Sequence, residues 1–270
     1  MKTLYVSDLD KTLLRDDQLL SDLSEKAIEK LMGEGMIFTY ATARSADTAR
    51  TATKGLKIPF AIVYNGAFIV DTESGEQIMS SAFRKNESEK LIKELLSSGV
   101  YPRVFSMTDG RERFTYTPEH LESAAAKEYF RTRKNDPRAR LGEEKDLLEG
   151  EIFLISCCGE KERLLPLYEK LKDACICHFY PDSYSPDHYL EFLPEGATKA
   201  AAVLRLKEHL GCEKIVAFGD AVNDVSMFEI ADECFAVENA CDELKAIATA
   251  VIPSNEEDGV AKWLLANAEF

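Results

Sequence analysis

The stretch Thr3-Leu-Tyr-Val-Ser-Asp8-Leu-Asp10-Lys-Thr12-Leu-Leu14 opens the chain and decides its fold. The β-forming run Leu4–Val6 predicts a buried strand, and the strand ends in two carboxylates spaced two residues apart. Ligands of open α/β sheets bind beyond the carboxyl ends of the strands, so Asp8 and Asp10 stand where a site is expected. Two carboxylates this close repel each other unless a cation lies between them or one holds a proton. The stretch therefore predicts a strand that leads into an oxygen-rich site suited to Mg2+. The alternative for an isolated Asp-x-Asp is a pair of loop caps.

Composition limits the class of protein and its partners. The chain has 270 residues, of which 45% are apolar and 30% charged, and a formal net charge of −15. Such a charge argues against nucleic acid and anionic membranes as partners, since both are polyanions. No leader and no apolar stretch of the ~18 to 20 residues needed to span a bilayer is present, so we expect a cytoplasmic protein.

Seven cysteines, an odd number, favour reduced thiols over a disulfide framework. Cys157-Cys158 and Cys175-Ile-Cys177-His178 could be combined into a zinc site, but they lack Cys-x2-Cys spacing. They also lie in apolar runs typical of strands, so the interpretation as core thiols is favoured.

The first part of the chain alternates between strand and helix patterns. After the opening strand come a helix over about 22–32, a strand over 36–41, a helix over about 45–54 and a strand over 61–64. Short connections between such elements are the signature of a parallel sheet. The predicted fold class is α/β, with a Rossmann-like doubly wound parallel sheet as the core.

A second module interrupts this alternation. Short strand patterns at 67–70 and 77–79 predict a small antiparallel excursion, and helices and strands then follow in a different order up to Asp187. The original pattern returns with the strand 188–193. We therefore predict a core domain of residues 1–82 and 188–270 and an inserted α+β cap domain of residues 83–187.

Polar residues that folding does not require follow three of the predicted core strands, and a lysine begins a later helix. Parallel neighbours bring such strand ends to one edge of the sheet. Carboxylates there can hold Mg2+, and a hydroxyl and a cation can hold a phosphoryl group. Each residue alone has an ordinary explanation as a helix cap or a solvated side chain; it is their combination that predicts a site. The four groups are Asp8/Asp10/Thr12, Thr42/Ala43/Arg44, Lys199 and Asp220/Asn223/Asp224.

In this order, the four groups resemble the motifs of the haloacid dehalogenase superfamily of aspartate-nucleophile phosphohydrolases. The insertion between the second and third motifs is similar to the C2B cap of the Cof-type branch, and the resemblance covers nearly the whole chain. One departure is Ala43, where these proteins commonly have glycine. The methyl group removes no hydrogen-bond donor, so we expect activity to survive.

The resemblance implies a role for each residue. Asp8 would attack phosphorus and form an aspartyl-phosphate, Asp10 would act as general acid and then general base, and Lys199 would offset negative charge. The implied Mg2+ ligands are Asp8, Asp10, Asp220 and Asp224, the last direct or in an outer position. The implied substrate and phosphate contacts are Thr42, Ala43, Arg44, Lys199 and Asn223.

The resemblance predicts a Mg2+-dependent phosphatase for a small phosphorylated metabolite, a sugar phosphate or similar. A sugar phosphomutase with the same nucleophile is the alternative, since arginines on the cap could anchor a second phosphate. A phospho-acceptor signalling domain is less favoured, because its acidic residues lie on different strands and it carries no ~100-residue insertion. Tyr184, Tyr189 and Glu191 are candidate substrate contacts of the cap.

Overall fold

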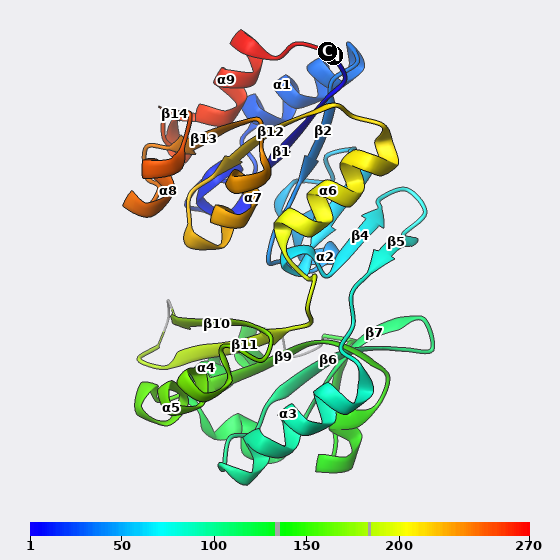
Figure 1. Ribbon diagram of the computed structural model, residues 1–270, viewed down its shortest axis with the longest axis vertical. Coiled ribbons are helices and arrows are strands. Elements are labelled where there is room, and N and C mark those ends of the chain that lie inside the picture. The colour runs from blue at the N-terminus through cyan, green and yellow to red at the C-terminus, as the bar shows by residue number, and fades with distance from the viewer. Residues whose placement is uncertain (133–135, 183–184) are drawn as a thin grey trace. The chain divides into compact units, whose positions relative to one another are not determined.

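The computed structural model describes residues 1–132, 136–182 and 185–270. The chain divides into two compact units (Figure 1). Met1–Ser80 and Gly196–Phe270 form the first, here called the core unit, and Ser81–Glu195 form the second, the insert unit.

A five-stranded parallel sheet organises the core unit, with the opening strand β1 next to last in the order β14-β13-β12-β1-β2. β1 lies between β12 and β2, and all five of its residues are buried. This burial agrees with the continuous apolar run from which the strand was predicted. The strands are β1 (Thr3–Ser7), β2 (Ile37–Tyr40), β12 (Lys214–Gly219), β13 (Glu233–Val237) and β14 (Ala250–Ile252).

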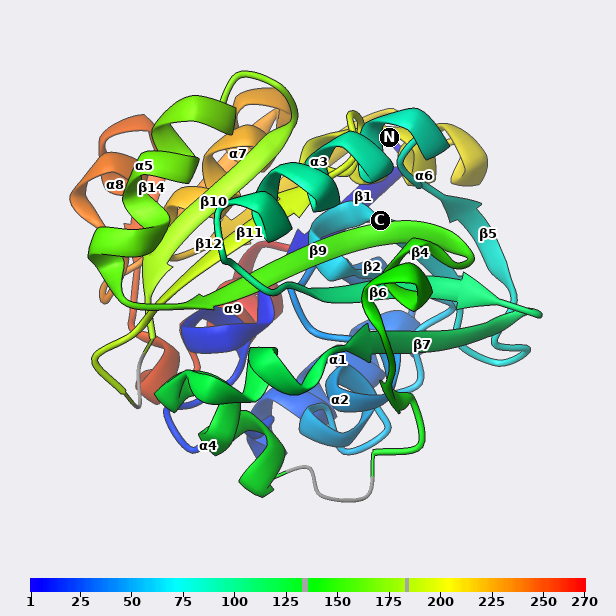
Figure 2. The same ribbon diagram turned by 90° about the horizontal axis from the view of Figure 1, so that it is seen from below.

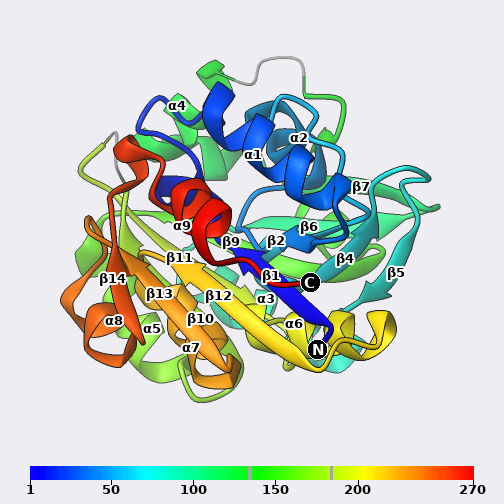
Figure 3. The same ribbon diagram turned by 90° about the horizontal axis from the view of Figure 1, so that it is seen from above.

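Helices cover both faces of this sheet, as expected for a doubly wound fold. α1 and α9 pack together on one face, and α6 and α7 lie on the other (Figure 3). The predicted α/β class with a parallel sheet core is confirmed. The helices of the core unit are α1 (Asp22–Gly33), α2 (Ala46–Ala52), α6 (Lys199–Leu210), α7 (Val225–Ile230), α8 (Asp242–Ile247) and α9 (Gly259–Asn267).

The predicted antiparallel excursion is present as a sheet of β3 (Phe60–Val63), β4 (Phe68–Asp71) and β5 (Gln77–Ser80). We predicted β3 as a further parallel strand of the main sheet. It follows β2 only through one parallel bridge, Ala41 to Ile62, and its continuous ladder is the antiparallel one with β4. The tight turn at 64–66 reverses the chain at once, so β3 pairs with its own continuation.

The insert unit has a six-stranded sheet in the order β10-β11-β9-β6-β7-β8. All neighbours are antiparallel except the pair β7 and β8. Its strands are β6 (Arg103–Thr108), β7 (Arg111–Tyr116), β8 (Ala139–Leu141), β9 (Glu151–Gly159), β10 (Ile176–Pro181) and β11 (His188–Leu193). Its helices are α3 (Lys85–Ser97), α4 (Ala124–Thr132) and α5 (Lys161–Leu171).

α3 and α5 lie on one face of the insert sheet and α4 on the other (Figure 2). The face under α3 and α5 holds the hydrophobic core of the unit, which includes Ile92, Ile155, Leu164 and Phe192. The opposite face carries a cluster of aromatic rings beneath α4, for example Phe114 beside Phe130.

The second predicted domain boundary is wrong. We placed the return to the core at His188, whereas β11 pairs along its length with β9 and β10 of the insert sheet, and the core unit resumes at Gly196. The apolar pattern of 188–193 suits a strand in either sheet, and only the pairing decides between them. The first boundary differs by two residues, with the insert starting at Ser81 rather than at Phe83.

All seven cysteines are unpaired thiols, as predicted. The metal-ligand cluster found among the described residues contains no cysteine, which agrees with the interpretation of Cys157 and Cys177 as core thiols. Within the residues that the structure describes, none of the helices has the length and apolarity needed to cross a bilayer.

Candidate active site

Asp8 follows the last residue of β1 and is buried at the carboxyl edge of the parallel sheet. Its backbone N–H continues the ladder by donating to the carbonyl of Phe218 at 2.9 Å. The chain then leaves the sheet through a wide π-type turn, Leu9–Leu13, which the amide of Leu14 closes on the carbonyl of Leu9 at 2.8 Å. Lys11 adopts φ of 60° within it. The turn carries Asp10 away from Asp8.

Lys199 is the first residue of α6, yet its side chain is only 1% exposed. Its Nζ donates to Oδ1 of Asp8 and, at 2.7 Å, to Oδ1 of Asp224. A first-turn lysine opposes the helix dipole, and here two buried carboxylates compensate for that position. The ammonium group therefore bridges two strand ends that are adjacent in the sheet.

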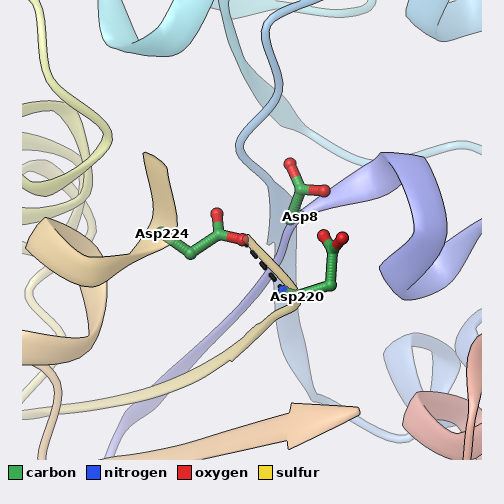
Figure 4. A group of neighbouring side chains, drawn as sticks. All are labelled: Asp8, Asp220 and Asp224. Carbon is green, nitrogen blue, oxygen red and sulfur yellow. Dashed lines mark hydrogen bonds between the residues drawn. The ribbon is translucent and has the colours of Figure 1, made fainter. Parts of the chain in front are cut away.

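Three carboxylates gather at this edge. One oxygen from each of Asp8, Asp220 and Asp224 lies within 4.8 Å of the other two. Figure 4 shows the three side chains as neighbours. The Oγ1 of Thr12 donates to Oδ1 of Asp220 at 2.9 Å. Oδ2 of Asp224 accepts the amides of Asp220 at 3.0 Å and Ala221 at 3.1 Å, the first of which is drawn in Figure 4. Asp224 is thus bonded through both oxygens, to Lys199 and to the loop that presents Asp220.

Two glycines allow this close packing. A Cβ on Gly219 would lie 2.7 Å from Oδ2 of Asp224. A Cβ on Gly66, which has φ of 99°, would lie 2.1 Å from the backbone oxygen of Thr198. The turn Tyr64–Gly66 therefore packs directly on the start of α6, where Lys199 begins.

The electrostatics follow from burial and crowding. Burial raises the pKa of Asp8 well above its ordinary value; the charge of Lys199 opposes this shift, and Asp224 and Asp220 add to it. Burial and then the charge of Asp224 raise the pKa of Asp220 to about 6. Burial alone would lower the pKa of Lys199, but attraction to Asp224 and Asp8 outweighs it and the pKa rises.

Asp10 departs from the predicted ligand set. Its carboxylate accepts from Arg44 twice, at 2.8 Å from Nε and 2.6 Å from an amino nitrogen, and it is not part of the three-carboxylate cluster. The role of Asp10 as a metal ligand stays a prediction; in this structure its carboxylate pairs with Arg44. The turn at Leu9–Leu13 directs Asp10 toward Arg44. A guanidinium that donates two hydrogen bonds stabilises the Asp10 carboxylate, whereas the neighbouring carboxylates would repel it.

The second predicted motif lies in the loop after β2. The hydroxyl of Thr42 accepts the amide of Arg44 at 3.1 Å, and the Thr42 carbonyl accepts the amide of Asn65 at 2.8 Å. The side chain of Asn223 donates to Asn65 at 3.4 Å. Ala43 is exposed, and its amide donates none of the hydrogen bonds between described residues. These contacts join the second and fourth motifs through Asn65.

The residues fit a divalent cation. Three carboxylates face one ammonium group, so the cluster has an excess of negative charge. Burial raises the pKa of Asp8 and of Asp220, and the negative charge of neighbouring carboxylates adds to both shifts. All donor atoms are oxygens, as Mg2+ prefers. Asp8 and Asp220 are the residues best placed to hold it, because both oxygens of Asp224 are already engaged.

Sequence reasoning missed the supporting residues. Thr12 was quoted with the first motif but was given no role, although it fixes Asp220. Gly66 lies in the turn after β3, where its positive φ and its close approach to Thr198 set the start of α6. The Asn-Gly pair was the available signal, since such pairs adopt left-handed turns.

The candidate substrate contacts of the insert are partly described. Tyr189 and Glu191 lie on β11, where Glu191 accepts the hydroxyl of Ser156 at 3.1 Å. Tyr184 lies outside the described residues.

Comparison with known proteins gives a consistent picture. Residues 5–264 match the family described as haloacid dehalogenase-like hydrolase. The chain is 31% identical, over 95% of its own length and 95% of the relative's, to the 5-amino-6-(5-phospho-D-ribitylamino)uracil phosphatase YwtE of Bacillus subtilis.

Solved structures agree in fold. TM0651 from Thermotoga maritima matches 100% of this chain and 99% of its own with a TM-score of 0.80 and 26% identity. The sugar phosphatase BT4131, described as belonging to subclass IIB, matches 98% of both chains with a TM-score of 0.74 and 21% identity, which is a likeness of fold.

Proposed function

The chain belongs to the haloacid dehalogenase-like hydrolase family, and on this premise we propose that it is a Mg2+-dependent phosphatase working through a phosphoryl intermediate on Asp8. The observation that carries the proposal is the buried Lys199 bridging Asp8 and Asp224 at the carboxyl edge of the parallel sheet. That arrangement supplies a nucleophile, its counter-charge and an acidic cation site in one place.

Asp8 is the proposed nucleophile. Lys199 holds its Oδ1, which leaves Oδ2 to attack phosphorus. The new Asp8 oxygen–phosphorus bond forms as the ester oxygen–phosphorus bond breaks, and water then cleaves the acyl phosphate to release inorganic phosphate and restore the carboxylate. Bound Mg2+ would supply charge compensation for the carboxylates and the phosphoryl oxygens.

Asp10 is the proposed acid and base. It would give a proton to the leaving oxygen and later accept one from the attacking water. The ion pair with Arg44 holds its carboxylate in one orientation. An arriving phosphoryl group offers Arg44 a second anion, and a guanidinium that moves toward it releases Asp10 for proton transfer.

Asp224 is proposed as a positioning residue and not as the third carboxylate on the cation. It fixes Lys199 with one oxygen and the amides that precede it with the other. The charge of Lys199 in turn opposes the rise in the pKa of Asp8 that burial causes, and so favours the ionised form of the proposed nucleophile.

The phosphoryl oxygens would meet donors from two loops. The amide of Ala43 and the side chain of Asn223 are the proposed donors, and the Thr42 hydroxyl orders the loop by accepting the amide of Arg44. Backbone amides at fixed positions stabilise developing negative charge without reorganisation. Ala43 is an exposed residue, and we expect its methyl group to leave room for these contacts.

Two observations support a small metabolite as the substrate and hydrolysis as the reaction. YwtE is named for a pyrimidine that carries a phosphorylated polyol, and BT4131 is named as a sugar phosphatase. We take this class, a polyol phosphate with or without a ring, as the first set of substrates. Both names describe phosphatases, which favours hydrolysis over the phosphomutase alternative.

The test is phosphate release from a panel of phosphorylated metabolites with Mg2+ or with EDTA. We expect Mg2+-dependent release in the wild type and a loss of at least about a thousandfold in Asp8→Asn, with Asp173→Asn, an exposed position, as the control. Undiminished turnover by Asp8→Asn would exclude Asp8 as the nucleophile. An isomeric sugar phosphate in place of free phosphate would establish the mutase.

A further inference from the structure

The segment that follows β1 contacts the carboxyl ends of three other strands of the core sheet. These strands, β12, β13 and β14, follow one another on one side of β1. The contact at the end of β12 is the hydrogen bond from Thr12 to Asp220, which belongs to the carboxylate cluster. The contacts at the ends of β13 and β14 have no part in the proposed chemistry. The turn that carries Asp10 is therefore held from several strand ends.

Asn239 makes the contact at the end of β13. It lies two residues after Val237, the last residue of that strand, and its Nδ2 donates to the carbonyl of Lys11 at 2.8 Å. Lys11 has φ of 60°, a left-handed conformation that is unfavourable for a residue with a side chain. The hydrogen bond to its carbonyl stabilises that conformation. Because Lys11 directly follows Asp10, its conformation helps to fix where the Asp10 side chain points.

Asn255 makes the contact at the end of β14. It is only 3% exposed, and its Nδ2 donates to the carbonyl of Leu14 and to Oδ1 of Asp16, each at 3.1 Å. The amide of Leu14 is the group that closes the π-type turn on Leu9. Moving either acceptor away would leave a buried N–H without a partner, which is costly. Asn255 therefore fixes the end of the turn.

The two asparagines are bonded to each other. The backbone amide of Asn255 donates to Oδ1 of Asn239 at 3.1 Å. This bond orients the side chain of Asn239, since its oxygen faces Asn255 and its NH2 group faces Lys11. One chain of hydrogen bonds thus runs from Lys11 through both asparagines to Leu14.

The residues after the turn are anchored to the same short segment, 255–258. Arg15 donates twice to Asp258, at 3.3 Å from Nε and 2.6 Å from an amino nitrogen. The amide of Asp16 donates to Oε1 of Glu256 at 2.7 Å. Two parallel bonds between a guanidinium and a carboxylate fix direction as well as distance. The segment 255–258 therefore holds the chain from Leu14 to Asp16 as a unit.

We propose that Asn239 and Asn255 are positioning residues for Asp10. They hold the backbone of the turn at Lys11 and Leu14, and so keep the Asp10 carboxylate in a fixed place relative to Asp8. A general acid acts only within hydrogen-bond reach of the leaving oxygen, so a relaxed turn would withdraw the proton when the ester bond breaks. The proposal rests on the proposed function of Asp10 and names the residues on which that function depends.

The leaving group of the substrate reports on the acid. A sugar or polyol phosphate releases a basic oxygen that needs a proton, whereas 4-nitrophenyl phosphate releases a phenolate that is stable without one. Asn239→Asp keeps the oxygen that accepts from Asn255 but replaces the donor to Lys11 by an oxygen. We expect kcat/KM to fall at least about tenfold on the sugar or polyol phosphate that the wild type turns over fastest, and less than about threefold on 4-nitrophenyl phosphate. Asn239→Ala, which adds no charge, should show the same selectivity.

Asn267→Asp is the matched control. Nδ2 of this exposed asparagine also donates to a backbone carbonyl, that of Trp263 at 2.9 Å, and the variant should change neither rate. Asp10→Asn should show the same selectivity as Asn239→Asp, to a greater extent, because it removes the acid itself. Equal losses on both phosphates in the two Asn239 variants, with or without a fall in Tm, would show a purely structural role and overturn the proposal.

Hydrogen exchange keeps this proposal separate from the phosphatase function. Mass spectrometry of a peptide that contains residues 9–16 measures the protection of the turn without any substrate. We expect faster exchange there in Asn239→Asp and in Asn255→Ala, and no change in Asn267→Asp. Absence of turnover on every phosphate would refute the phosphatase function, and exchange would then decide alone whether the asparagines hold the turn. Unchanged exchange in Asn239→Asp overturns the proposal whatever the turnover.

Discussion

Lys199 shows how one side chain serves both fold and chemistry. It is the counter-ion of two buried carboxylates, Asp8 and Asp224. We expect Lys199→Met to lower turnover at least about a hundredfold and to lower the free energy of unfolding by about 3 kcal/mol, because removing one partner leaves buried charge uncompensated. Urea unfolding and phosphate release measure the two effects. Lys262→Met, at an exposed position of α9, should change neither; equal behaviour of both variants would contradict the assignment.

Gly66 tests the packing beneath Lys199. An alanine there would place its Cβ 2.1 Å from the Thr198 backbone oxygen, at a φ that is strained for any side chain. We expect Gly66→Ala to lower Tm by roughly 5 °C or more and to reduce activity, since α6 must shift. Gly33→Ala, whose Cβ meets nothing within 4 Å, is the control. An unchanged Tm for Gly66→Ala would mean that the turn moves freely.

The raised pKa of Asp220 predicts how pH and Mg2+ are linked. The folded protein holds a proton on Asp220 up to about pH 6, whereas the unfolded chain loses it near 3.8. Without a divalent ion, the contribution of this group to stability is therefore largest below about pH 4 and falls as pH rises to about 6. Mg2+ binds the ionised carboxylates, so its effect on Tm should be larger at about pH 7.5 than at about pH 5. In Asp220→Asn the pH dependence of this increment should be much reduced; an increment that grows with acidity would refute the cation site.

At the scale of elements, the short connections after the strands fix the directions of the side chains in the candidate active site. The turn after β1 sends Asp10 toward Arg44 and returns Thr12 to Asp220, and it is held from elsewhere in the core by Asn239, whose side chain donates to the carbonyl of Lys11 at 2.8 Å. The start of α6 sets Lys199 in the same way. The helices and strands therefore form a rigid scaffold, and the residues at their ends form the candidate active site.

Two helix caps test whether the start of α6 positions Lys199 in addition to stabilising the fold. Thr198 caps α6 by accepting the amide of Ala201, and Ser21 caps α1 by accepting that of Ser24, each at 3.0 Å. Replacing either by alanine should cost about 1 kcal/mol of stability. Only Thr198→Ala should also lower kcat, because Lys199 adjoins that cap. Equal kcat values for the two variants would show that the cap does not position the lysine.

At the scale of the whole molecule, the chain forms two units with separate cores. The hydrophobic cluster of the insert draws all its members from residues 83–192, including Leu95, Leu147 and Phe192. We expect the fragment 81–195 to fold by itself and to unfold cooperatively in urea, followed by circular dichroism. A fragment without a cooperative transition would mean that the insert depends on the core unit for its stability.

The sequence alone determined the features that depend on local patterns of residues. Alternating strand and helix patterns gave the parallel core, and the motif spacing placed Asp8, Lys199 and Asp220 at one edge of it, because strand ends follow from strand order. The insertion was recognised from its change of pattern. The predicted end of the insertion was wrong, because the pattern of residues 188–193 indicates a strand but not the strands with which it pairs.

Tertiary structure alone decided the rest, because the decisive contacts join residues far apart in the chain. Asp10 and Asp8 share one motif, yet the π-type turn and Arg44 separate them. The sequence did not decide whether Asp224 is a direct ligand of the cation. In the structure its carboxylate accepts from Lys199 and from two backbone amides, which is the geometry of a residue that positions its neighbours. Arg103, Ser156 and Glu191 become neighbours on three strands only through strand register. Spacing along a chain gives the types of residue at a site; the directions of their side chains depend on pairing and packing, which no local pattern encodes.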